Sequence, residues 1–371
     1  MKVLVSAGEA SGELHASALV ETLARRHPDW QFFGCAGPRL QAAGVRPVMD
    51  AAKLNVVGLA EVVTHIPGIW REYRRLLAAA DREKPAVAIL TDSPDFNLRV
   101  ARQLARRGVP VVYLVAPQAW AWREGRVKAM RRDLRKLLCI FPFEEAWFRQ
   151  RGVDAVYVGH PLVERVRPTQ SRAEFRRAHQ VPDDARLVAV LPGSRPGVMA
   201  RHREAVLDAI ARLESQGAKC ILGLPDEKSR RIFVNQSGVS SIKETVGETW
   251  NLLNAADVAL SASGTVTMEA ALLGTPMVTF YRVNAASWLA GKWLVRTPFY
   301  TMVNLIAERK IVPELMQSEA TGENLAREVA ALLADPARRE AMRQALAHEA
   351  HGLFRLAARA FGIELQLHPG L

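Results

Sequence analysis

A short apolar run that ends in a Gly- or Ser-rich turn and continues into a helical segment recurs along the chain. Residues 2–6 open the first half in this way, and residues 187–191 restart the pattern after a polar stretch at 163–185. A buried strand that feeds a turn and a helix is the building unit of doubly wound parallel sheets. The recurrence therefore predicts an α/β chain of two doubly wound domains with a ligand cleft between them.

The polar stretch also sets the domain boundaries. The chain has 371 residues, a length that suits about two domains. We assign 1–165 to an N-terminal domain, 166–340 to a C-terminal domain and 341–371 to a helical tail. The tail region is rich in Ala and Arg, and it either packs back on the first domain or pairs with a second subunit.

A net charge of +12 predicts an anionic partner, which can be a nucleic acid, a phosphorylated substrate or an anionic membrane face. Cys35, Cys139 and Cys220 lie far apart in apolar runs, so we expect buried free thiols in a reducing compartment. No apolar run approaches about 18 residues and no signal peptide is evident. We therefore expect a cytoplasmic protein that can rest on a membrane surface.

Residues 261–282 have the pattern strand, Ser/Gly/Thr turn, short helix, strand. The turn at Ser263, Gly264 and Thr265 leaves backbone N–H groups free at a helix N-terminus, which is a favourable site for a phosphate or diphosphate. Glu269 follows about one helical turn later, where it can reach a ribose hydroxyl. The alternative is an ordinary βαβ unit in which Gly264 and Gly274 serve only as turn and C-cap.

Two further turns carry candidate chemistry. Gly8 to Glu13 follows the first strand without a G-x-G-x-x-G fingerprint, so it is a tight turn, a place where a ligand approaches the backbone, or both. Asp92 and Asp95 follow the strand at 86–90. Asp95 comes after Pro94 and is expected to cap the next helix. Asp92 has no such structural role and is the candidate general base. The alternative is a loop carboxylate bonded to backbone N–H groups.

Aromatic and basic residues are concentrated in three places. Trp120, Trp122 and Arg123 follow a strand, where they either wall a cleft or cover the end of the sheet. The helical pattern at 66–80 is either a core-facing helix or a basic amphipathic helix on a membrane interface. Residues 285–296, with Trp288 and Trp293, are a second candidate for contact with lipid.

Several motifs occur together in one order, and this set closely resembles the lipid-A-disaccharide synthases, a family of bacterial glycosyltransferases. The resemblance covers nearly the whole chain, and it rests on Gly8–Gly12, Ala36–Pro38, Asp92–Asn97, Trp120–Arg123, Phe141–Glu144, Val158–Pro161, Leu191–Arg195, Ser263–Thr265 and Asn304–Leu305.

The resemblance implies a GT-B fold, two Rossmann-like domains with C-terminal helices, in which the second domain holds most of the nucleotide. It implies transfer of 2,3-diacylglucosamine from its UDP form to 2,3-diacylglucosamine 1-phosphate (lipid X), giving lipid A disaccharide 1-phosphate and UDP with inversion at the anomeric centre. It further implies that no metal or cofactor is needed, that the protein is peripheral on the inner membrane, and that it can form a homodimer.

The resemblance also implies roles for individual residues. Asp92 matches the proposed base of the family. The residues implied on the UDP side are Arg195, Ser263, Gly264, Thr265, Glu269 and Asn304. Acceptor-side or loop candidates are Gly8, Glu9, Ser11, Gly12, Trp122 and Arg123. The chain departs from the family pattern at Glu13 (usually Asp), at Ala116 (commonly Ser) and at 196–199, where an acid often follows the Gly-Ser-Arg sequence closely.

Two other functions fit parts of the pattern. A UDP-sugar 2-epimerase shares the double-Rossmann architecture but has no need of two lipid-facing aromatic helices. A nucleic-acid-binding module would alternate Lys or Arg with exposed aromatics on one face, whereas here the aromatics recur at core spacing, so we expect no nucleic acid partner. His348 and His351 lack a third metal ligand nearby in the sequence and are expected to lie on a solvated helix.

Overall fold

The computed structural model describes residues 1–51, 59–233, 242–284, 288 and 297–360. It divides into two compact units, Met1–Pro161 with Leu356–Leu371, and Leu162–Arg355. The chain thus passes from the first unit to the second between Pro161 and Leu162. Of the tail expected at 341–371, residues 361–371 lie outside the described residues.

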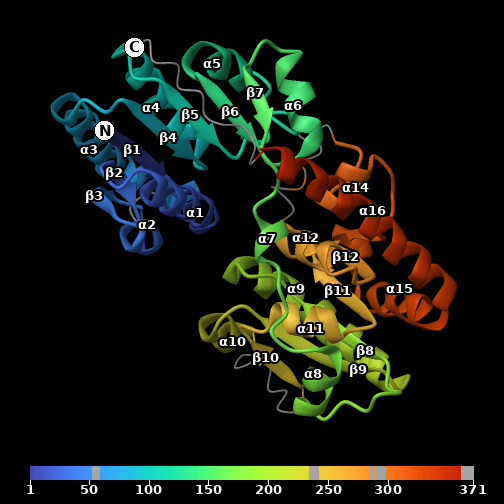
Figure 1. Ribbon diagram of the computed structural model, residues 1–371. Helices are drawn as coiled ribbons and strands as arrows, with labels where there is room; N and C mark the ends of the chain where they lie inside the picture. The colour runs from blue at the N-terminus through green and yellow to red at the C-terminus, as the bar shows by residue number, and fades with distance from the viewer. Residues whose placement is uncertain (52–58, 234–241, 285–287, 289–296, 361–371) are drawn as a thin grey trace. The chain divides into compact units, whose positions relative to one another are not determined.

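The first unit is built on a seven-stranded sheet in the order β3-β2-β1-β4-β5-β6-β7, and every strand pair in it is parallel (Figure 1). Its strands are β1 Lys2–Ala7, β2 Gln31–Ala36, β3 Val45–Asp50, β4 Val87–Thr91, β5 Val111–Leu114, β6 Lys136–Cys139 and β7 Ala155–Tyr157. Its helices are α1 Ala10–Arg26, α2 Pro38–Ala42, α3 Leu59–Glu83, α4 Pro94–Arg106, α5 Arg126–Asp133 and α6 Pro142–Arg149.

Successive side chains of β1 pack against helices on opposite faces of this sheet. Leu4 packs in one core cluster with Leu76 of α3 and Leu98 of α4. Its neighbours Val3 and Val5 pack on the other face, in a cluster that includes Ala16 and Val20 of α1. Successive strand residues point to opposite faces, and both faces are apolar. The first unit is therefore doubly wound, as the strand–turn–helix pattern predicts.

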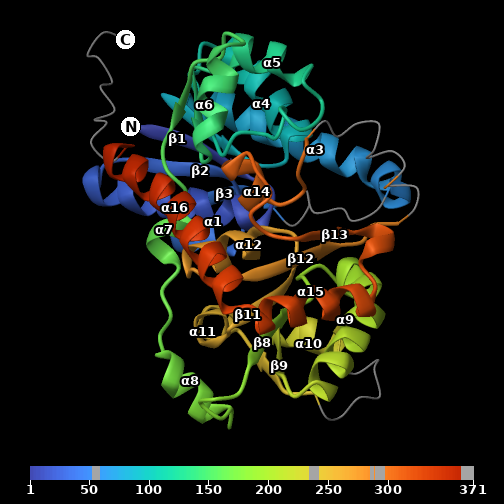
Figure 2. The ribbon, with the colours of Figure 1, turned by 90° about the vertical axis from the view of Figure 1, so that its right-hand side faces the viewer.

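The second unit is built on a six-stranded parallel sheet in the order β10-β9-β8-β11-β12-β13. Its strands are β8 Leu187–Leu191, β9 Lys219–Leu224, β10 Glu244–Val246, β11 Val258–Ala262, β12 Met277–Tyr281 and β13 Glu314–Met316. Its helices are α7 Leu162–Arg165, α8 Arg172–Ala178, α9 Pro196–Ser215, α10 Glu227–Phe233, α11 Thr249–Ala255, α12 Thr265–Leu272, α14 Met302–Ala307, the 3-10 turn Gln317–Glu319 and α15 Gly322–Ala334. Helix α16 Pro336–Ala360 begins in the second unit, and its end from Leu356 belongs to the first. Helices α9 and α15 pack side by side (Figure 2).

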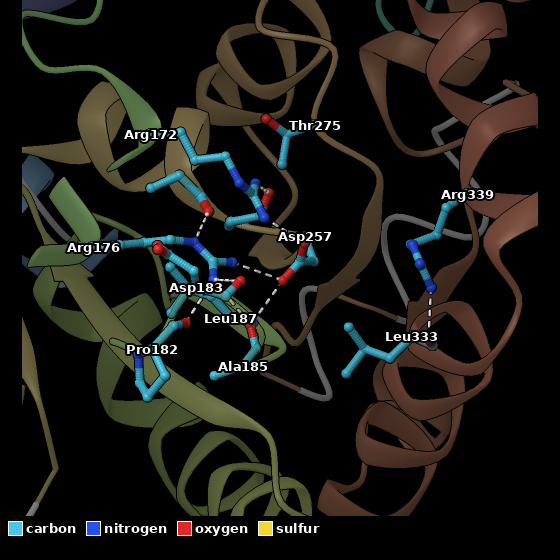
Figure 3. Close-up of polar contacts among 12 residues, drawn as sticks. Arg172, Arg176, Pro182, Asp183, Ala185, Leu187, Asp257, Thr275, Leu333 and Arg339 are labelled. Atoms are coloured by element: carbon cyan, nitrogen blue, oxygen red, sulfur yellow. Dashed lines mark hydrogen bonds and ion pairs between the residues drawn. The ribbon is translucent and has the colours of Figure 1, made fainter. Parts of the chain in front are cut away.

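A buried arginine organises the amino end of this second sheet (Figure 3). Arg176 of α8 is 1% exposed, and its guanidinium pairs with Asp257, which precedes β11. Asp257 also accepts from Leu187 N–H at the start of β8 and from Arg172. The Arg176 guanidinium donates to the carbonyls of Pro182, Asp183, Ala185 and Ala255. A buried charge satisfied on all sides is a structural anchor, and it leaves the opposite, carboxyl ends of the strands for a ligand.

Candidate active site

The carboxyl ends of β1 and β4 form the first candidate site. The two strands are neighbours at the point where the strand order reverses, which is where open α/β sheets bind ligands. Asp92 follows β4, and its carboxylate accepts from the backbone N–H of Gly8 at 2.7 Å and of Glu9 at 3.0 Å, in the turn after β1. The structure therefore brings Gly8, Glu9 and Asp92 together in one unit.

Burial sets the proton affinity of this carboxylate. Desolvation raises the pKa of Asp92 to about 7, against the opposing effect of the two backbone hydrogen bonds from Gly8 and Glu9. A carboxyl group that has a pKa near neutrality and makes no ion pair with another described residue suits proton abstraction. Asp92 is thus a loop carboxylate bonded to backbone N–H groups, as one interpretation of the sequence predicts. Its environment also suits the other interpretation, a general base.

Two side chains hold the strained backbone of Asp92 in place. Asp92 has a φ of +51° and Ser93 a φ of +37°, both in the left-handed region. The Tyr113 hydroxyl donates to the Asp92 carbonyl at 2.5 Å, and Asn97 Nδ2 donates to the same carbonyl at 3.1 Å. The Ser6 hydroxyl in turn donates to Asn97 Oδ1 at 2.8 Å. Asn97 closes the predicted Asp92–Asn97 motif, but nothing local in the sequence marks Tyr113.

Gly12 is required by the close approach of α1 to Asp92. A Cβ atom on Gly12 would stand 1.8 Å from Asp92 Oδ2. Gly12→Ala should therefore push the carboxylate away from its two N–H donors. If Asp92 acts as the general base, kcat/KM should fall on the order of 100-fold, the cost of misplacing such a group by about 1 Å. Steady-state kinetics check the expected loss.

Gly68→Ala is the matched control, because it is also a helical glycine and its Cβ would meet nothing within 4 Å. Gly68→Ala should melt close to the wild type, whereas Gly12→Ala should melt a few degrees lower, since overpacking costs about 1–3 kcal/mol. A Gly12→Ala enzyme with unchanged kcat/KM would show that the Asp92 position does not matter.

Glu13 and Ser11 complete the loop candidates of the first unit. Glu13 is buried and accepts from Leu40 N–H at 3.0 Å, inside the first turn of α2. A Cβ on Gly37 would stand 2.6 Å from the Glu13 carboxylate, so the glycine makes room for it. Glu13 thus caps α2. Ser11 lies in α1, and its side chain is outside the described set.

Asp95 does not cap α4, so that prediction is wrong. Pro94 occupies the first helical position and makes Ser93 the N-cap residue. The Asp95 carboxylate is 71% exposed and pairs with Arg123 at 2.8 Å and Arg126 at 2.7 Å. Both guanidiniums lie over the ring of Trp122, at 4.6 and 5.1 Å from its centroid. The cluster of Trp122, Arg123 and Arg126 is therefore a cationic surface near the start of α4.

A second candidate site lies in the second unit, at the carboxyl ends of β8 and β11. These strands are neighbours at the reversal of strand order in that sheet. A pocket of about 340 Å³ opens there. Its lining residues include five of the predicted positions: Arg195, Ser263, Gly264, Thr265 and Glu269.

Two helix N-termini meet this pocket. Arg195 is the N-cap residue of α9 and Gly264 that of α12. Free N–H groups and the helix dipoles make both ends favourable for negative charge. The exposed Arg195 guanidinium has no hydrogen bond or ion pair to another described residue. The pocket therefore has the donors and the free cation that a diphosphate needs.

Glu269 and Asn304 differ in their relation to this pocket. Glu269 lines it, and its Oε2 accepts from Trp250 Nε1 at 3.0 Å, while burial raises the pKa of the Glu269 carboxyl. Asn304 is fully buried and is not among the lining residues. Its amide bonds the backbone of Ile311 and Val312 and the side chain of Glu314. Asn304 thus holds the segment before β13 in place.

The structure also bears on the cysteines, on metal binding and on membrane-spanning helices. Cys35, Cys139 and Cys220 are free and buried, as expected. Among the described residues, no group of three or more His, Cys, Asp or Glu side chains could hold a metal ion. No helix in the described part of the chain is both long enough and apolar enough to cross a bilayer. Trp293 and the His351 side chain lie outside the described residues.

Solved structures share this architecture at low sequence identity. A UDP-GlcNAc 2-epimerase of Neisseria meningitidis, bound to UDP-GlcNAc, has a TM-score of 0.62 at 13% identity and covers 97% of this chain and 100% of its own. A glycosyltransferase involved in lipopolysaccharide biosynthesis has a TM-score of 0.55 at 14% identity, with 98% and 99% covered. The fold is therefore GT-B, shared by glycosyltransferases and epimerases.

Sequence comparison identifies the family. A family model described as Lipid-A-disaccharide synthetase matches residues 3–360. A lipid-A-disaccharide synthase of Solibacter usitatus is 59% identical over 347 residues, which cover 93% of this chain and 91% of the relative. The enzyme of the same name from Myxococcus xanthus is 42% identical over 351 residues, again 93% and 91%. The chain therefore belongs to the lipid-A-disaccharide synthetase family, and it is a GT-B glycosyltransferase of lipid A biosynthesis.

Proposed function

We propose that the protein joins UDP-2,3-diacylglucosamine to 2,3-diacylglucosamine 1-phosphate, releasing UDP and inverting the anomeric centre. The observation that carries this proposal is the Asp92 carboxylate, held by two backbone N–H groups with its pKa raised to about 7. Direct displacement at an anomeric carbon requires one base to take the proton of the attacking hydroxyl. Asp92 is that base in the proposed reaction.

The second unit supplies the leaving-group chemistry in this proposal. As the sugar–oxygen bond breaks, negative charge grows on the UDP diphosphate. The Arg195 guanidinium and the N-terminus of α12, both lining the 340 Å³ pocket, would bind that charge. Glu269 would bond a ribose hydroxyl from its position in the same pocket. No metal or cofactor enters the proposal.

The acceptor carries a phosphate, and the first unit has a cationic surface for it. Arg123 and Arg126 already share the Asp95 carboxylate, which shows that their guanidiniums converge on one anion. A phosphate monoester has more charge and more acceptor oxygens than a carboxylate. We propose that the 1-phosphate of the acceptor binds this pair of arginines.

We further propose that the enzyme is peripheral on the cytoplasmic face of the inner membrane and that α3 contacts lipid. Trp70 is 48% exposed, and the Arg74 guanidinium lies 5.5 Å from its ring centroid. Trp70→Ser should lower co-sedimentation with anionic vesicles several-fold, because an interfacial Trp is a main anchor of such helices. Trp147→Ser, at an aromatic of the same unit that also lies under an arginine, is the control; an equal loss in both variants would refute a specific role for α3.

The function is tested by incubating the enzyme with both lipid substrates and following UDP and disaccharide together. We expect equal amounts of both products, no UDP release without acceptor, and the same rate with EDTA. The epimerase alternative predicts a changed UDP-sugar without any acceptor. Acceptor-independent turnover, or a loss with EDTA that Mg²⁺ restores, would refute the corresponding part of the proposal.

A further inference from the structure

His202 is a buried histidine beside the second-unit pocket for which the proposed chemistry has no role. It lies on α9 and is 0% exposed. Its ring packs against Phe280 and Tyr281 at the end of β12, with centroid distances of 4.9 and 5.3 Å. A fully buried imidazole is costly unless both nitrogens have partners, so its two hydrogen bonds indicate what it does.

The partners of the two ring nitrogens determine the tautomer. Nδ1 lies 2.8 Å from the Pro192 carbonyl oxygen, which can only accept, so Nδ1 carries the proton. Nε2 lies 3.0 Å from the Arg282 backbone nitrogen, which donates, so Nε2 is unprotonated. The neutral ring with the proton on Nδ1 is therefore the one form that makes both bonds.

Each of these two partners adjoins residues that line a different part of the pocket. Pro192 begins the loop whose next three residues, Gly193 to Arg195, line it, and Arg282 directly follows the lining residue Tyr281. The loop is a tight one, since Gly193 has a φ of +111°. We infer that His202 is a positioning residue that ties the Arg195 loop to the end of β12 in the geometry that binds a nucleoside diphosphate. The inference rests on the proposed function of this pocket.

Protonation would break this connection. Burial lowers the pKa of His202 below its ordinary value of 6.5, and the cations Arg201 on its own helix and Arg282 after β12 act in the same direction. A second proton would place a ring N–H against the Arg282 N–H. The contribution of His202 to binding is therefore complete above pH 6.5 and is lost as the pH falls through the lowered pKa.

The test is calorimetric titration with UDP of the wild type, His202→Leu, His202→Asn and Thr279→Val. His202→Leu keeps the volume but removes both bonds, and it should raise the Kd for UDP about tenfold. His202→Asn keeps a donor for Pro192 and should recover to within about threefold. Thr279→Val removes another buried side-chain hydrogen bond on β12, to the Pro313 carbonyl, and should leave the Kd unchanged.

Two further readouts separate positioning from general destabilisation. The donor KM of His202→Leu should rise with the Kd, while the acceptor KM stays near the wild-type value. The ratio of wild-type to His202→Leu affinity should be constant above pH 6.5 and should shrink as the pH falls through the lowered pKa of His202. A His202→Leu protein that binds UDP like Thr279→Val would overturn the inference. Failure of the wild type itself to bind UDP would instead refute the proposed function.

Discussion

Asp92→Asn should lower kcat on the order of 10²–10⁴-fold, the usual contribution of a positioned general base. The amide is nearly isosteric and cannot take a proton from the acceptor hydroxyl. The wild-type kcat/KM should fall tenfold per pH unit below about 7, because the base is protonated there, and the variant should lack this acidic limb. Rate measurements from pH 5 to 9 check both expectations.

The matched control for this prediction is Asp81→Asn, which removes an exposed carboxylate paired with Arg107 in the same unit. Its activity should stay close to the wild type, since exposed ion pairs contribute little to stability. UDP affinity should be unchanged in Asp92→Asn, because the pocket lies in the other unit. A folded Asp92→Asn enzyme that binds UDP and keeps near-normal turnover would eliminate Asp92 as the base.

Arg195→Gln should lower kcat about 10²–10³-fold and weaken UDP binding, because the guanidinium would stabilise charge that develops on the diphosphate. The side chain is exposed at the N-cap position of α9 and makes no ion pair with another described residue, so little structure depends on it. Arg195→Lys should recover part of the rate as a point charge without bidentate geometry. Single-turnover kinetics separate this effect from product release.

Arg212→Gln provides the matched control, at the other end of the same helix. Arg212 pairs with Asp208 on the surface, away from the pocket-lining residues. Its loss should change neither kcat nor the Kd for UDP. If Arg195→Gln behaved like Arg212→Gln, the leaving group would have to be stabilised by other donors, such as the N–H groups at the start of α12.

Local signals in the sequence explain why the fold and part of each site were predictable. Asp92 and Ser263–Thr265 each follow an apolar run directly, so their position at the carboxyl end of a parallel strand follows from the order of elements. Strand order is not encoded locally. Both sites lie where the strand order of their sheet reverses. This position is known only from the pairings of β1 with β4 and of β8 with β11.

The features that the sequence did not reveal are those made by distant residues. Tyr113 supports Asp92 from 21 residues away, and the two bonds of His202 reach 10 and 80 residues along the chain. The partners of Asp95, Arg123 and Arg126, come from another part of the chain, so its local sequence does not reveal them. The family resemblance implies a place for Asn304 on the UDP side, and its side-chain hydrogen bonds in the structure are to residues 311–314 of its own unit.

The configuration of the new glycosidic bond tests the central claim most directly. A single displacement with Asp92 as base inverts the anomeric centre, whereas a covalent intermediate on an enzyme nucleophile would invert it twice. Proton NMR of the UDP donor and of the disaccharide reports the anomeric configuration of each through its coupling constant. We predict opposite configurations in donor and product; the same configuration in both would contradict a single displacement with Asp92 as base.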